Sequence, residues 1–243
     1  MLAAALSLLF LQAADLAGAN VQSAAASDGA PEPSGRYAEC IAAIEVDADA
    51  AYEAAMGWAN ETGDLEAYRC AATALIDQGR FDQGARRLES LASAAEGHHP
   101  AILAGLFSQA GHAWLLARDG GRARSAFTRA IAALGNDREA LPDMLIDRSL
   151  AYTEEGDHRH AEEDLSRALD LRPDDALALR LRAMSRMRQN VLDLAAVDAE
   201  RALAIDPRNI ESGVVLGHIR ESQRIGRPIN ENTGEPAEET RVQ

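Results

Sequence analysis

Histidines and carboxylates are the candidates in this sequence for metal binding and for acid–base catalysis. His98 and His99 precede a proline, and His158 and His160 flank an arginine. A protein zinc site needs three or four ligands at suitable spacing, and neither pair has a third ligand nearby in the sequence. We therefore expect solvated loop histidines and predict no metal site.

Neighbouring carboxylates occur at Glu154 and Glu155 and again at 162–164. Two carboxylates can act as general acid and base, but only in an enclosing pocket that shifts a pKa. The sequence has no G-x-S-x-G, no P-loop and no glycine-rich nucleotide motif. It also has no lysine, which excludes Schiff-base chemistry. We predict no catalytic residue and no cofactor; the rival interpretation is an envelope hydrolase that uses Glu154, Glu155 and Glu162.

The composition favours helices and argues against a nucleic-acid binder. Of 243 residues, 47% are hydrophobic but only 4% are aromatic, and alanine and leucine dominate. The net charge is -15, whereas nucleic-acid affinity depends mainly on basic charge.

The two ends differ in composition from the middle of the chain. Residues 2–11 are apolar except for one serine, which resembles the core of a signal peptide and is too short to span a bilayer. No basic residue precedes this run, because the first is Arg36. We expect a signal-peptide-like segment at 1–26, a linker at 27–35 and a disordered polar tail at 225–243. The mature chain would then be periplasmic or otherwise exported, without a stable membrane span; the alternative is a cytoplasmic protein.

A repeated pattern of residue types runs through the middle of the chain. Ala161, Leu165, Ala168, Leu169 and Pro173 recur, with the same spacing, as Ala195, Ala199, Ala202, Leu203 and Pro207. Looser copies upstream include Gly111 and Phe127, and further upstream Leu88. A period of about 34 residues indicates stacked pairs of helices.

Each recurring residue has a packing reason. Small residues such as Gly111 and Ala123 suit the close approach of two antiparallel helices, and Phe127 fills the space between hairpins. Pro173 and Pro207 cannot continue a helix, so they end the second helix of a pair. The next helix is then capped by Asp175 or Asn209. The turns inside hairpins are expected at Gly79 and Gly156.

This pattern resembles the tetratricopeptide repeat family. The similar segments are 65–98, 104–137, 142–175 and 176–209, followed by a closing helix at 210–224, within a repeat domain at 64–224. Residues 36–63 resemble a degenerate leading hairpin. The resemblance implies an all-α, right-handed superhelical solenoid of antiparallel helix hairpins.

The resemblance also implies a function: a scaffold or adaptor that binds another protein or a peptide in a concave groove. From the signal-peptide-like segment at 1–26, we expect this function to be performed in the bacterial cell envelope. The family's first helices line this groove, and the carried-over contact positions are His112, Leu150, Glu154, Arg180, Met184, Met187 and Arg188. We expect the two methionines to be exposed beside the arginines at 180, 182, 186 and 188. The alternative is that these arginines pair with Glu154, Glu155 or Glu162 of the preceding repeat. The family's clamp for peptide carboxyl termini is not supported, because its positions are Arg69 and Thr73 here.

Cys40 and Cys70 are the only cysteines in the chain. In the family's solenoid they fall on neighbouring first helices, so a disulfide is possible in an oxidising compartment. The alternative is two separately buried thiols.

Overall fold

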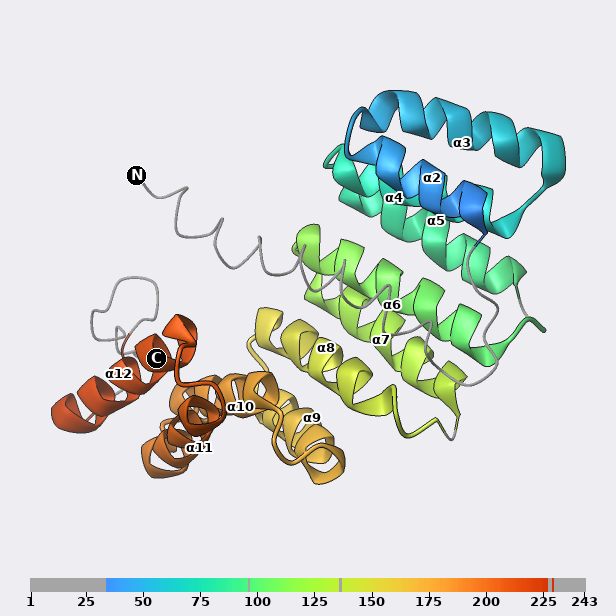
Figure 1. Ribbon diagram of the computed structural model, residues 1–243. Coiled ribbons are helices and arrows are strands. Elements are labelled where there is room, and N and C mark those ends of the chain that lie inside the picture. The colour runs from blue at the N-terminus through green and yellow to red at the C-terminus, as the bar shows by residue number, and fades with distance from the viewer. Residues whose placement is uncertain (1–33, 96, 136, 227–228, 230–243) are drawn as a thin grey trace, which may run out of the picture. The chain divides into compact units, whose positions relative to one another are not determined.

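The computed structural model describes residues 34–95, 97–135, 137–226 and 229 (Figure 1). The regular elements within these ranges are all helices. The chain divides into two compact units, Met1–Glu154 and Glu155–Gln243. The signal-like segment expected at 1–26 lies outside the described residues, as do most of the expected linker and tail.

The first unit is a series of helices joined by short turns. They are α2 (Gly35–Ile44), α3 (Ala48–Thr62), α4 (Leu65–Asp77), α5 (Phe81–Ala94), α6 (Pro100–Leu116), α7 (Gly120–Leu134) and α8 (Leu141–Glu154). Each helix packs against the next, and α2 also contacts α4 while α6 contacts α8 (Figure 1). The first helices α2 and α4 therefore lie next to each other, as do α6 and α8.

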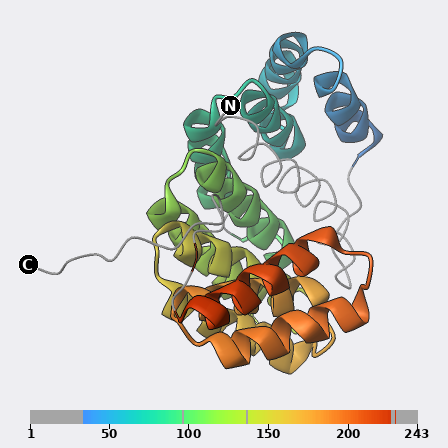
Figure 2. The same ribbon diagram turned by 90° about the vertical axis from the view of Figure 1, so that its left-hand side faces the viewer.

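The second unit repeats this arrangement with four helices. They are α9 (His158–Leu171), α10 (Ala176–Arg188), α11 (Leu192–Ile205) and α12 (Ile210–Ile225). Consecutive helices pack together, α10 also contacts α12, and α11 and α12 lie side by side (Figure 2).

Local sequence signals set the helix ends, as the pattern predicts. The Asp175 carboxylate accepts the Ala178 N–H at 2.9 Å, and the Asn209 amide oxygen accepts the Ser212 N–H at 2.8 Å. These bonds satisfy backbone donors that have no partner within the first turn of a helix. The preceding helices α9 and α11 end two residues before their prolines. Both caps and both stops are confirmed.

The turns inside the hairpins share one backbone conformation. Gly79 and Gly156 adopt left-handed φ values of 75° and 76°. The corresponding turns before α7 and α11 place Arg118 and Asn190 at φ 61° and 62°. Glycine adopts this region without a steric cost, so the two predicted turn glycines are confirmed.

The core is formed where a small residue faces a large one. A Cβ added at Gly111 would lie 2.6 Å from the Phe127 ring, so only glycine permits this approach of α6 and α7. Ala123, Ala161 and Ala195 are fully buried at the matching repeat positions, as expected. No helix among the described residues is long and apolar enough to cross a membrane.

Candidate functional site

The candidate binding residues of the first unit lie on α6 and α8. His112 on α6 directs its Nε2 atom at Asp147 of α8, 3.1 Å away. Both side chains are largely buried, with exposed fractions of 14% and 5%. The His112 ring also packs edge-on against Phe127, with 5.1 Å between ring centroids. His112 therefore joins two first helices, and its role as a contact for a partner stays a prediction.

The electrostatic environment of His112 favours the protonated ring. Burial alone would lower the pKa of His112, but the Asp147 charge and the hydrogen bond to it raise this pKa above its ordinary value. The folded chain therefore holds the His112 proton to a higher pH than an ordinary histidine does.

Leu150 and Glu154 complete the predicted set on α8. Leu150 is half-buried, and the exposed Glu154 pairs with Arg118 Nε at 3.0 Å. Arg118 belongs to the turn between α6 and α7, so this pair connects that hairpin to the end of α8. Leu150 and Glu154 are not part of the hydrophobic core cluster in which α6 packs against α7.

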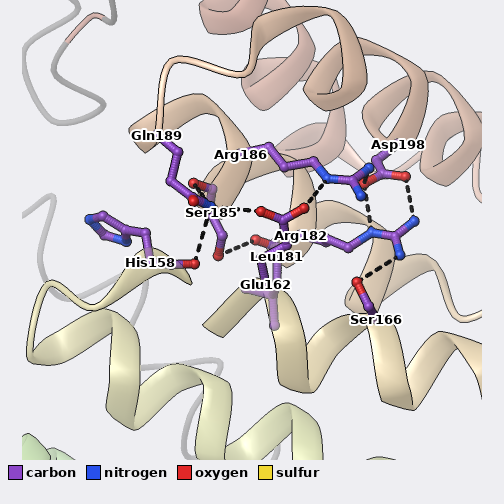
Figure 3. A network of polar contacts seen from close by, with 9 residues as sticks. All are labelled: His158, Glu162, Ser166, Leu181, Arg182, Ser185, Arg186, Gln189 and Asp198. Carbon is purple, nitrogen blue, oxygen red and sulfur yellow. Dashed lines mark hydrogen bonds and ion pairs between the residues drawn. The ribbon is translucent and has the colours of Figure 1, made fainter. Parts of the chain in front are cut away.

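Two of the predicted arginines of α10, Arg182 and Arg186, pair with acidic residues of the neighbouring helices α9 and α11. Arg182 donates from Nε and Nη2 to the two oxygens of Asp198 on α11, both at 2.8 Å (Figure 3). Arg186 donates to the same carboxylate at 2.7 Å and to Glu162 of α9, also at 2.7 Å. Gln189 donates to the other oxygen of Glu162. Three helices are thus connected by one polar network, and the expected pairing of an arginine with Glu162 is confirmed.

Arg180 points to a different neighbour. Its guanidinium pairs with Glu211 of α12, and only 12% of the arginine side chain is exposed. Burial lowers the pKa of Arg180, and the Glu211 charge opposes this change. Glu211 was not among the acids expected to pair with the α10 arginines.

The expectation for the methionines is partly wrong. Met187 is fully buried in a cluster with Ala195, Ala199 and Ile219, so it is no exposed contact. Met184 is half-buried at the edge of the same cluster. The physical reason is that α11 and α12 both pack on α10, which covers the side of the helix that carries Met187. Met184 and the exposed Arg188 stay predicted contacts.

Asp198 is the important residue that the sequence reasoning missed. Its side chain is only 4% exposed, yet it accepts hydrogen bonds from two arginines. A signal was present, because Asp164 occupies the same position in the preceding repeat, and its side chain is only 5% exposed. When an acidic residue recurs at the same repeat position, on the helix face that carries the buried alanines, it indicates a buried ion pair. A solvent-exposed carboxylate would not need to keep this position.

The other groups considered for chemistry are engaged in local contacts. His99 caps α6, where its Nδ1 accepts the Ala101 N–H at 3.3 Å, and His160 pairs with Asp157. Across the described ranges, no three His, Cys, Asp or Glu side chains are grouped to hold a metal ion.

The structure joins Cys40 of α2 to Cys70 of α4 as a disulfide, with Cα atoms 6.4 Å apart. Cys70 is fully buried beside Trp58 and Ala67, so the bond lies within the core of the leading hairpin and its neighbour. Oxidation of the pair in the native compartment stays a prediction.

Three features define the class of fold as tetratricopeptide repeats. They are the recurring helix pairs, the small residue that faces a large one between paired helices, and the left-handed turns. Solved structures of similar proteins agree. MamA from Desulfovibrio magneticus RS-1 is 15% identical, with a TM-score of 0.58 over 72% of this chain and 98% of that chain. TTC0263, a thermophilic TPR protein of Thermus thermophilus, is 19% identical, with a TM-score of 0.53 over 75% and 95%.

A chain of the APC/C hetero-tetramer Cut9–Hcn1 is 20% identical, with a TM-score of 0.56 over 73% of this chain and 34% of that chain. No protein-family model matches the sequence, and no curated protein matches it. The chain has the tetratricopeptide-repeat fold, and its all-α class is confirmed.

Proposed function

We propose that the protein is a non-catalytic interaction module that binds another protein or a peptide on the first helices of its hairpins. The observation that carries this proposal is the polar connection between those helices in the first unit. Arg69 of α4 donates from Nε to Gln109 of α6 at 2.9 Å, and His112 of α6 pairs with Asp147 of α8. The three first helices are thereby fixed in one register.

A fixed row of helices is a suitable surface for recognition, because a surface that is ordered before binding loses little entropy on binding. Half-buried Leu115 and Leu150 provide apolar contact area on this row, and exposed Glu154 provides charge. This mixture of apolar and polar groups is typical of protein interfaces. The similar chain of Cut9–Hcn1 is part of a hetero-tetramer, which supports a role in assembly.

Partner capture with matched variants tests the proposal. Leu150→Arg places a charge on the first-helix row, and Arg188→Glu reverses a charge on α10. Ala132→Arg is the control, because Ala132 is exposed on α7, a second helix. We expect at least one of the two test variants, with unchanged melting, to lose a protein that the wild type and the control retain. Unchanged capture by both folded variants would contradict the proposal.

We further propose that the protein works in an oxidising compartment of the bacterial envelope. Two observations support this location: the apolar segment at 2–11 and the pairing of Cys40 with Cys70. Structural disulfides persist in exported proteins and are rare in the cytosol.

Cell fractionation with N-terminal sequencing and thiol labelling tests the location. We expect a shortened N-terminus and no free thiol in protein unfolded without reductant. A cytoplasmic protein with an intact N-terminus and two free thiols would rule the proposal out.

A further inference from the structure

Buried aspartates of this chain differ in the partners that balance their charge. Within the described part of the chain, the buried aspartates are Asp147, Asp164 and Asp198. Asp198 accepts hydrogen bonds from the guanidinium groups of two arginines, and Asp164 pairs with the guanidinium of Arg167. Charge-assisted hydrogen bonds of this kind compensate for the removal of a carboxylate from water. Asp147 contacts His112 instead of an arginine.

The carboxylate of Asp147 is only half engaged. Its Oδ1 atom lies 3.1 Å from His112 Nε2, and 5% of the aspartate side chain is exposed. Its Oδ2 atom is buried and has no hydrogen-bond partner among the described residues. Each oxygen of a carboxylate can accept hydrogen bonds, and a buried acceptor without a donor is costly. A donor that reaches Oδ2 therefore gains a strong contact.

Asp147 lies on the first helices that we propose as the binding surface. The His112 side chain is 14% exposed, so the pair is not sealed from the surface between α6 and α8. Leu115 follows His112 by three residues and Leu150 follows Asp147 by three, so each half-buried leucine shares a side of its helix with the polar residue. A polar group bordered by apolar side chains is typical of the anchoring points of protein interfaces.

The charges around Asp147 favour a cationic donor. Helix α6 contains no aspartate, glutamate, lysine or arginine, and its one ionisable residue is His112. The neighbouring Arg148 of α8 is directed at α7, where it donates to Thr128 at 3.2 Å. The chain as a whole has a net charge of -15, which attracts a basic partner over a longer range.

We propose that the partner inserts an arginine side chain between α6 and α8 and that its guanidinium donates to Oδ2 of Asp147. This inference rests on the proposed function and names the chemistry of the partner: a basic segment whose neighbouring apolar side chains contact Leu115 and Leu150. Arginine is favoured over lysine because its planar guanidinium matches the geometry of a carboxylate, as Arg182 does at Asp198.

Peptide selection on the purified full chain tests the proposal. The probe is a displayed library of random peptides, and we expect the wild type to enrich peptides that carry arginine beside apolar residues. The affinity of one such peptide is then compared with that of the same peptide carrying citrulline, which has the shape of arginine without its charge. We expect the wild type to bind the arginine peptide at least about tenfold more tightly. Asp147→Asn should bind both peptides equally.

Glu53→Gln is the matched control. It also removes one negative charge, but from an exposed position on α3, a second helix, so the preference for arginine should stay as in the wild type. Enriched peptides without arginine, or a preference that persists in Asp147→Asn, would overturn this inference and leave the proposed function standing. A wild type that enriches no peptide also overturns the inference, and the partner capture described above then decides whether the proposed function fails with it.

His112→Gln separates this role of Asp147 from a purely structural one. If the pair only holds α6 and α8 together, His112→Gln and Asp147→Asn should lose peptide binding alike. At about pH 6 the raised pKa keeps the wild-type ring protonated. Loss of this charge should increase the preference for the arginine peptide, because no second cation then competes for Asp147. This result remains measurable if Asp147→Asn fails to fold, and a reduced preference in His112→Gln would overturn the proposal.

Discussion

The buried carboxylate of Asp198 determines how α9, α10 and α11 are held together. Two guanidinium groups share this carboxylate in a region that excludes most water (Figure 3). Removal of one member of a buried ion pair leaves an uncompensated charge, which costs much more than an exposed pair contributes.

Asp198→Ala is therefore expected to lower the free energy of unfolding by about 3–5 kcal/mol. Glu200→Ala is the control, because Glu200 pairs with Arg220 at the surface and its loss should cost no more than about 1 kcal/mol. Urea denaturation followed by circular dichroism measures both values. Similar small losses in the two variants would mean that the network contributes little to stability.

His112 and Asp147 predict a pH dependence with a definite sign. The pKa of His112 is raised in the folded state, so the folded chain binds the proton more tightly than the unfolded chain does. The stabilisation is complete below the ordinary histidine pKa of about 6.5 and is lost as the pH rises through the raised pKa.

We expect the stability difference between the wild type and His112→Gln to shrink as the pH increases. Melting temperatures of both proteins across this pH range measure the difference, and comparison with the variant removes the contribution of the other histidines. A difference that is constant or grows with pH would show that the pair does not stabilise the fold as an ion pair.

At the scale of helices, the disulfide between α2 and α4 secures the first hairpin of the array. The core there is built from Tyr37, Ile44, Trp58 and several alanines. Alanine buries little apolar surface, so we expect a covalent bond to add substantially to the stability of this hairpin.

Reduction of the Cys40–Cys70 bond, which closes a loop with a sequence separation of 30, is expected to cost about 3–4 kcal/mol on the chain-entropy model. Chemical denaturation with and without reductant measures the loss. Cys40→Ala should be weakened to a similar extent and should not respond to reductant. A wild type that is equally stable in both conditions would refute this role of the disulfide.

At the scale of the whole chain, a repeat protein is stabilised mainly by contacts between neighbours. In the second unit, α12 buries Val215, Leu216 and Ile219 against α10 and α11. Removal of α12 exposes this part of the core to water. It removes no contact of the helices at the start of the chain.

Truncation after Asn209 should therefore lower the melting temperature and increase amide hydrogen exchange in α10 and α11. Exchange in α2–α5 should stay unchanged, because those helices lie in the other compact unit. Hydrogen-exchange mass spectrometry resolves the two regions. Unchanged protection in α10 and α11 would reject the role of α12 as a closing helix, and equal loss in α2–α5 would reject local stabilisation.

The helices, their ends and the class of fold could be predicted from the amino-acid sequence alone. Asp175, Asn209, Pro173 and Gly79 act within a few residues of their own positions, and the repeat period reports a packing unit that recurs along the chain. Such signals are local, so they can be read without knowledge of which helices touch.

The burial of particular side chains and the pairing of particular charges became known from the three-dimensional packing of the helices. Met187 was expected to be exposed, but α11 and α12 cover its side of α10. Arg180 and Glu211 are far apart in the sequence, as are His112 and Asp147, yet each pair is in contact. Burial and pairing depend on helices distant in sequence, whose approach is set by the volumes of all the residues between them; a local pattern contains no such information.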